Sequence, residues 1–158
     1  MACVPIETRS SRAFTLVEMT MCMVIMLLFA AIAAPRYANS IARYRADMAA
    51  KRLAADVNWA RALARTGSTS RSITFNTGTS TYTLTGVSNP DSPSSTYSVN
   101  LSLSPYKSTI TSASFGATST LTFDGFGTPS NAGTVVITCG ATSKTVSVNA
   151  DDGAVSVQ

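Results

Sequence analysis

The 158-residue chain carries a formal charge of only +4, and 45% of its residues are hydrophobic whereas 13% are charged. It contains no histidine, so it lacks the commonest general base and the commonest zinc ligand. The length leaves room for one small folded head after an apolar N-terminal segment. We therefore expect a protein that is not an enzyme and that needs no cofactor or metal.

The first predicted element is an apolar helix over residues 14–34, in which Glu18 is the single charged residue. A helix of that length rises about 30 Å, enough to cross the hydrocarbon core of a bilayer. Arg9 and Arg12 precede it, and basic residues favour the cytoplasmic side of a membrane. We expect a single-pass membrane protein with a cytoplasmic N-terminus and its head outside the cytoplasm.

Two interpretations of this segment differ in where the chain is cleaved. An ordinary secretory signal is cut after its apolar run, and AAIAAP at 30–35 offers such a site near Ala34. However, the carboxylate of Glu18 costs about 2.5–3.5 kcal/mol at mid-membrane, so such a residue usually has a partner. A cut just before Phe14 creates an α-amino group of opposite charge four residues from Glu18. The cut before Phe14 therefore gives the Glu18 carboxylate a charged partner. The alternative is a secreted or simply anchored β domain.

Ala13 followed by FTLVE at 14–18 resembles the prepilin cleavage and methylation motif of type IV pilins and type II secretion pseudopilins. In that family a membrane peptidase cuts before the Phe and methylates its amine, and the Glu helps to position a subunit against its neighbour. The resemblance implies a leader peptide over residues 1–13, cleavage between Ala13 and Phe14, N-methylation of Phe14 and an assembly role for Glu18. Ala13 departs from the pattern, because the family usually has Gly before the cut.

A second, amphipathic helical segment is predicted over residues 35–66. Pro35 can kink a helix, but residues 36–65 contain no Gly and no further Pro. A stripe of apolar residues at three- to five-residue steps is expected to be covered by a sheet, with Trp59 at its border; the stripe is Ile41, Tyr44, Met48, Leu53, Val57, Ala60 and Ala64. The opposite face is expected to be solvated, and an electrostatic contact surface is the alternative; it carries Arg43, Arg45, Asp47, Lys51, Arg52, Asp56, Arg61 and Arg65.

Gly67 is expected to end the helix, and residues 67–158 are predicted to form a β-rich extracytoplasmic head. The expected strands are 70–76, 80–86, 96–103, 109–114, 119–124, 134–139, 144–149 and 154–157. Tight turns are expected at 76–78 and 151–153, and SNPDSPSS at 88–95 is expected to be an exposed loop. The fold class is therefore α+β, with a long N-terminal helix, half transmembrane and half amphipathic, packed on an antiparallel β-sheet head as in pilins.

Two further features of the head have ordinary structural explanations. Cys139 is the only head cysteine, which excludes a disulfide within the head, and we expect it to be buried and inert. Asp124, Asp151 and Asp152 resemble calcium ligands by chemistry, but they lie in turn sequences, and turn formation is the favoured role.

The order of the parts resembles the GspH/FimT branch of the pilin-like proteins, with ARALARTG at 60–67, LTFDGFGTPS at 121–130 and KTVSVNADDG at 144–153. The resemblance implies a minor pseudopilin of a type II secretion system or type IV pilus. Such a subunit assembles into a filament through its N-terminal helix after cleavage, and its partners are prepilin peptidase, other pilins or pseudopilins and the inner membrane.

The alternative implied by the FimT-like relatives is a DNA-binding minor pilin for DNA uptake. Basic side chains can contact phosphates without reading base sequence. The candidate nucleic-acid contacts on the head are few, namely Arg71, Lys107 and Lys144. DNA is therefore the less favoured partner.

Overall fold

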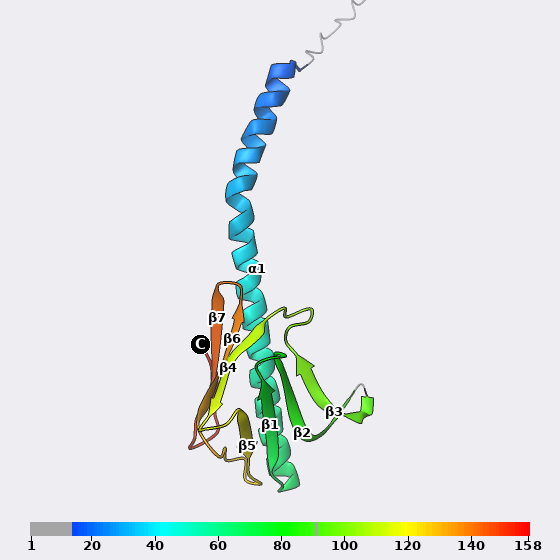
Figure 1. Cartoon of the computed structure of the whole chain (residues 1–158), viewed down its shortest axis with the longest axis vertical. Coiled ribbons are helices and arrows are strands. Elements are labelled where there is room, and N and C mark those ends of the chain that lie inside the picture. Colours follow the sequence, from blue (N-terminus) through cyan, green and yellow to red (C-terminus); the bar gives the residue numbers. More distant parts are fainter. Residues whose placement is uncertain (1–13, 91) are drawn as a thin grey trace, which may run out of the picture. The chain divides into compact units, whose positions relative to one another are not determined.

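A computed structural model describes residues 14–90 and 92–158, and the chain divides into two compact units, Met1–Tyr37 and Ala38–Gln158. One helix, α1 (Leu16–Gly67), contributes to both units and continues through Pro35 (Figure 1). By length and composition, α1 can span a membrane. All side chains of residues 14–37 are exposed, so no other part of the chain that the structure describes covers this apolar surface. Such a surface suits lipid or other protein chains.

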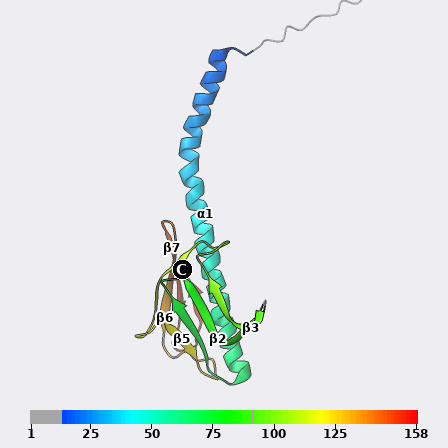
Figure 2. The same cartoon turned by 45° about the vertical axis from the view of Figure 1, so that its right-hand side comes forward.

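The second unit contains two four-stranded antiparallel sheets. The first has the strand order β3-β2-β1-β5, with β1 (Arg71–Asn76), β2 (Thr81–Asn89), β3 (Ser92–Asn100) and β5 (Thr120–Phe123). The second has the order β4-β6-β7-β8, with β4 (Thr109–Phe115), β6 (Gly133–Cys139), β7 (Thr142–Val148) and β8 (Val155–Val157). Figure 2 shows the sheets from a second angle. The predicted α+β class, a long helix with an antiparallel head, is confirmed, and the head has two sheets.

The expected exposed loop at residues 88–95 is wrong in its secondary structure. β2 extends to Asn89 and β3 already begins at Ser92, although the side chains of residues 92–95 are exposed. The prolines misled the prediction because proline cannot donate to a strand ladder. β3 is an edge strand, and its pairing with β2 shifts between Leu84 and Asn89, so that Pro93 has no Cα partner in the ladder. A proline is tolerated in such a place.

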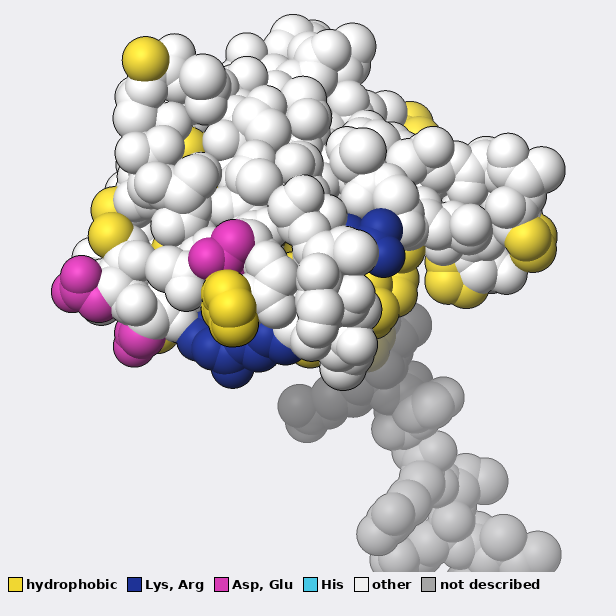
Figure 3. Space-filling model, turned by 90° about the horizontal axis from the view of Figure 1, so that it is seen from below, with side chains coloured by type: hydrophobic (Ala, Val, Ile, Leu, Met, Phe, Trp, Pro, Cys, Tyr) yellow, Lys and Arg dark blue, Asp and Glu magenta, His cyan; other side chains and the backbone are white. Residues whose placement is uncertain are grey.

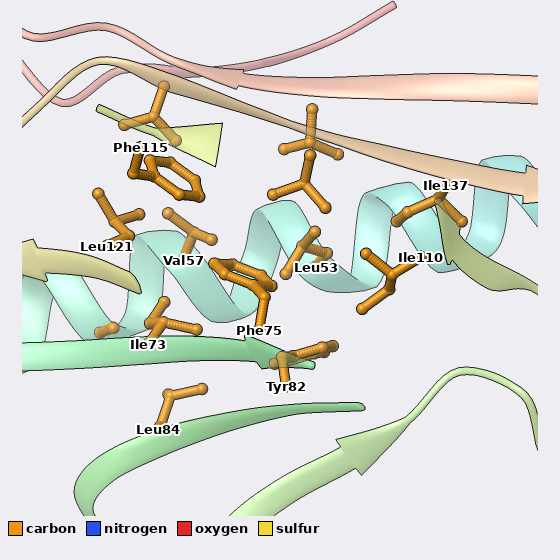
Figure 4. Packing of buried hydrophobic residues seen from close by; sticks show 14 of the residues in the cluster. Leu53, Val57, Ile73, Phe75, Tyr82, Leu84, Ile110, Phe115, Leu121 and Ile137 are labelled. Atoms are coloured by element: carbon orange, nitrogen blue, oxygen red, sulfur yellow. The ribbon is translucent and has the colours of Figure 1, made fainter. Parts of the chain in front are cut away.

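The core of the second unit lies between α1 and both sheets (Figure 4). Leu53 and Val57 from the helix pack with side chains of both sheets, among them Phe75 and Ile137. All buried hydrophobic side chains of the described residues belong to this unit, so it has a complete core of its own and meets the requirement for independent folding.

The buried stripe of α1 differs from the predicted one in its first half. Leu53, Val57, Ala60 and Ala64 are buried as expected, but Tyr44 is 66% exposed. The predicted stripe contained a five-residue step from Met48 to Leu53, which turns about 140° around a helix and so changes face. The residues that are in phase with Leu53 are alanines, and they fill the stripe instead: Ala46, Ala49 and Ala50.

The helix ends at Gly67, as predicted, through two hydrogen bonds typical of a Schellman motif. Thr69 N donates to Ala64 O (3.2 Å), and Ser68 N donates to Arg65 O (3.3 Å). The residue in the left-handed conformation is Ser68, with φ of 47°, rather than the glycine. Cys139 is buried and free, as expected, and its thiol donates to Lys107 O (3.3 Å).

Candidate functional site

The start of α1 is defined by reciprocal hydrogen bonds between Thr15 and Glu18. The Glu18 amide donates to Thr15 Oγ1 (3.2 Å), while Glu18 Oε2 accepts from both Thr15 N and Thr15 Oγ1 (2.9 Å each). This arrangement is a capping box, in which two otherwise unsatisfied amides at a helix N-terminus gain partners. The carboxylate also lies at the positive end of the helix dipole.

The capping box gives Glu18 a partner that the sequence analysis did not consider. The spacing T-x-x-E at residues 15–18 is the sequence signal of such a box, and it was overlooked because the cleavage motif explained the same glutamate. Phe14 precedes the helix and is 77% exposed, while Ala13 lies outside the described residues. The carboxylate is thus held beside the amide of Thr15, the residue bonded directly to Phe14.

In the head, a hydrogen-bonded cluster surrounds Asp56, which is only 5% exposed. Its Oδ2 accepts from Tyr82 Oη (2.5 Å), Tyr97 Oη (3.0 Å) and Arg52 Nε (3.2 Å), and Arg52 Nη2 also donates to Tyr97 Oη. The ring of Trp59 meets Tyr97 edge-on, with 5.3 Å between centroids. The cluster therefore ties α1 to β2 and β3.

The placement of Asp56 on a solvated face was wrong. A carboxylate on an amphipathic helix is usually exposed, but here two tyrosine hydroxyls and a guanidinium satisfy it inside the head. Burial, followed by the charge of Asp56, raises the pKa of Tyr82. Burial also raises the pKa of Tyr97, while the hydrogen bond to Tyr97 raises the pKa of Arg52. Tyr82, Tyr97 and Arg52 therefore keep their protons, which suits a structural role in holding α1 to the sheet.

A loop over residues 124–130 is fixed by bonds that leave one aromatic side chain exposed. Asp124 Oδ1 accepts from the amides of Phe126 (2.9 Å) and Thr128 (2.8 Å), which confirms its turn-forming role. Arg65 Nε donates to Phe126 O (2.8 Å), and Arg61 Nε donates to Gly127 O (3.2 Å). The Phe126 side chain is 84% exposed. A shallow pocket of about 490 Å³ lies beside it, lined by Arg65, Ser68, Gly125 and Phe126.

The three candidate nucleic-acid contacts lie toward opposite ends of the head. Arg71 lies where α1 ends, with Nη2 close to Gly67, and its Nη1 donates to Gly86 O (2.6 Å). We call this the Gly67 end. The Lys107 carbonyl accepts a hydrogen bond from the Cys139 thiol. The next residue, Gly140, lies against Ala42 of α1.

We call the side of the head near Ala42, where Lys107 lies, the Ala42 end. Lys144 on β7 pairs with Ile137 and also lies toward this end. The two ends are about 37 Å apart along α1, from 25 residues at 1.5 Å each. The structure therefore does not bring the three cations together.

Comparisons with known proteins agree on both parts of the chain. The family described as type II transport protein GspH matches residues 49–152, and the prokaryotic N-terminal methylation motif matches residues 8–34. None of the curated proteins compared with the chain matches it.

Two similar solved structures are both of the type IV minor pilin FimU from Pseudomonas aeruginosa, in different crystal forms. One has a TM-score of 0.54 at 19% identity, over 73% of this chain and 90% of that one. The other has a TM-score of 0.51 at 20% identity, over 71% and 91%. At this identity the likeness shows a shared fold.

Proposed function

Because this chain belongs to the GspH family of type II transport proteins, we propose that it is a minor pseudopilin of a type II secretion system or type IV pilus. In the proposed form it is cleaved between Ala13 and Phe14, methylated on Phe14, and assembled into a filament through its N-terminal helix. The observation that carries the proposal is the methylation motif at residues 8–34, which continues into an uncovered apolar helix. The motif implies processing by prepilin peptidase and assembly with other pilins.

The proposed division of labour follows the chain. Residues 1–13 are the leader, residues 14–34 hold the subunit in the inner membrane and later in the filament, residues 35–66 connect this segment to the head, and residues 67–158 form the head outside the cytoplasm. The role is structural rather than enzymatic. Arg71 lies at the opposite end of the head from Lys107 and Lys144, so the three candidate contacts do not form one basic surface and we do not propose DNA uptake.

Glu18 has two successive partners in the proposed mechanism. Before cleavage its carboxylate caps the helix through Thr15, which lowers the cost of placing it in an apolar segment. Cleavage before Phe14 adds a positive amine one residue from Thr15. A neighbouring subunit that supplies apolar packing and such an amine then gives the carboxylate an ionic partner. The gain favours moving the helix from lipid into the filament.

The test is the intact mass of the full chain extracted from membranes, with and without co-produced prepilin peptidase. The expected product lacks residues 1–13 and carries one added methyl group. A catalytically inactive peptidase is the control and should leave the precursor intact. Cleavage near Ala34, or a mass that does not depend on the peptidase, would instead identify a secreted or anchored β domain.

A further inference from the structure

The Ala42 end of the head carries basic side chains with little acidic charge to offset them. Two belong to α1 and two to the sheet region beside it, and they are Arg43, Arg45, Lys107 and Lys144. Between Ala38 and Leu53, α1 has one acidic residue, Asp47, and Lys51 already pairs with it (2.7 Å). Buried Asp56 is satisfied within its own cluster. The charge at this end is therefore positive over the residues that the structure describes.

Two large apolar side chains are exposed at the same end, Leu103 (61%) and Tyr44 (66%). Leu103 lies in a loop with a fixed backbone, because its carbonyl accepts from Lys107 N (2.9 Å). The loop closes where Ser108 N donates to the carbonyl of buried Leu101 (2.8 Å). The Leu103 side chain is thus presented to solvent by bonded backbone. Cations, a tyrosine and an exposed leucine together are typical of surfaces that lie at the boundary between water and lipid.

The Gly67 end has no such uniform charge. Figure 3 views the molecule from below and shows acidic side chains beside basic ones. Asp151 and Asp152 are exposed there, since their turn lies beside the loop where Gly153 approaches Gly127 O. The arginines at this end donate to backbone carbonyls of the head; they are Arg61, Arg65 and Arg71. Of the two ends, the Ala42 end is therefore the one suited to a uniformly anionic partner.

The chain itself keeps the Ala42 end close to any membrane that residues 14–34 span. Ala42 follows Ala34 by eight residues of α1, which rise about 12 Å as a helix, so the two lie no further apart than that in any direction of the helix. The headgroup layer of a bilayer already covers about 5–7 Å of this distance. The attraction of basic residues to anionic lipid acts over about a Debye length, about 8 Å at physiological salt. A tethered surface also meets its partner at high effective concentration, so weak contacts suffice.

We infer that the Ala42 end of the head binds the anionic lipid surface of the membrane that holds residues 14–34. The four cations contact lipid phosphates, while Leu103 and Tyr44 enter the headgroup layer. DNA also offers phosphates, but it has no apolar layer to receive Leu103, so the exposed apolar side chains favour lipid. The inference rests on the proposed function, because it needs residues 14–34 to lie in a membrane, and it names the class of lipid that the head contacts.

The first test is flotation of the purified unit Ala38–Gln158, which has its own core, with lipid vesicles. The unit should float with vesicles that contain phosphatidylglycerol but not with vesicles of phosphatidylcholine alone, and high salt should release it. Lys107→Gln combined with Lys144→Gln should weaken binding about 25-fold, from about fivefold for each charge. Leu103→Ser should weaken it about fivefold, because less apolar surface leaves water.

The matched control makes the same change in net charge at the other end of the head. Ser70 follows the end of α1, Ser130 ends the loop that contacts Arg65, and both are exposed. Ser70→Asp combined with Ser130→Asp should change binding by less than about twofold, because these sites lie several Debye lengths from the lipid contact. Equal weakening by this pair would overturn the inference. So would failure to bind phosphatidylglycerol vesicles, or tighter binding to duplex DNA than to those vesicles.

The second test uses the full chain in phosphatidylglycerol-containing vesicles, with Cys3, Cys22 and Cys139 changed to alanine and a fluorescent dye attached at Leu103→Cys. Lipids that carry a nitroxide near the headgroup should quench this dye, whereas they should not quench the same dye at Phe126→Cys. Intact mass after exposure to prepilin peptidase reports the proposed function separately. Normal cleavage and methylation with an unquenched Leu103→Cys dye would overturn the lipid contact and leave the proposed function standing. Absent cleavage with a quenched dye would overturn the proposed function and leave the lipid contact.

Discussion

Tyr82 Oη donates a 2.5 Å hydrogen bond to Asp56 Oδ2 across 26 residues of sequence. The bond joins the second strand of the head to the helix that enters it, and both partners are buried. Tyr97 and Arg52 bind the same oxygen, so one carboxylate connects three elements. The attachment of β2 and β3 to α1 therefore depends on a polar cluster as well as on the apolar core.

Asp56→Ala should lower the free energy of unfolding of the Ala38–Gln158 unit by about 3 kcal/mol, because Tyr82 and Arg52 would lose their buried acceptor. Asp47→Ala is the matched control: it removes an exposed pair with Lys51 at the same helical spacing and should cost less than about 0.5 kcal/mol. Urea unfolding of both variants checks this. Equal effects would show that the Asp56 cluster contributes no more than a surface pair.

The stability of the head should fall at alkaline pH because the pKa of Tyr82 is raised in the folded state. In the unfolded chain tyrosine ionises near pH 10, whereas folded Tyr82 keeps its proton. The contribution of Tyr82 to the free energy of unfolding is thus complete below pH 10. It is lost as pH rises above 10, by about 1.4 kcal/mol per pH unit. Urea unfolding at pH 8 and pH 11 should show a smaller loss for Tyr82→Phe than for the native chain; identical losses would contradict the prediction.

Glu18→Gln and Glu18→Ala should separate the capping role of Glu18 from its charge. Glutamine can still accept from Thr15 N and retain the capping box, but it cannot neutralise an amine. If the ionic contact drives assembly, both variants should insert in the membrane and be cleaved, yet both should be nearly absent from the filament fraction. Immunoblots of membrane and filament fractions measure this. Native-like assembly of the glutamine variant would assign the role of Glu18 to helix capping alone.

Gly127→Ala should destabilise the loop that carries Phe126. Gly127 has φ of 77°, and a Cβ there would lie 2.5 Å from Arg65 Nε, the atom that donates to Phe126 O. The expected loss in free energy of unfolding is about 1–2 kcal/mol from the left-handed conformation. Gly78→Ala is the control, since Gly78 has no positive φ and its nearest neighbour, Asn76 Oδ1, lies at 3.4 Å. A thermal melt that shifts equally in both variants would count against the prediction.

Much of the fold was predictable from local patterns. The head strands alternate buried and exposed residues, as in β1, where Ile73 and Phe75 face the core and Thr74 faces solvent, so a period of two located them to within a few residues. A strand at residues 92–95 could be predicted only if β3 were known to be an edge strand. Its edge position depends on the order of the strands in the sheet.

The candidate site was less predictable because its geometry depends on distant partners. Nothing near Asp56 in the sequence indicates that Tyr82 and Tyr97 will bury it, and a charged residue on a helix is by default placed in solvent. The role of Thr15 was different, since its spacing to Glu18 carries the full signal of a capping box. The positions of Arg71, Lys107 and Lys144 relative to one another required the strand order.

The Thr15–Glu18 box also sets where the helix begins relative to the proposed cleavage site. Phe14 and Thr15 are not helical, and the helix begins at Leu16. Proteases act on backbone that is locally unfolded, and a helix that continued toward the N-terminus would first have to unwind. The box begins the helix two residues after the proposed scissile bond, so Phe14 stays outside the helix while the residues from Leu16 onward are folded. The same two side chains that begin α1 thus mark the boundary next to the proposed cleavage site.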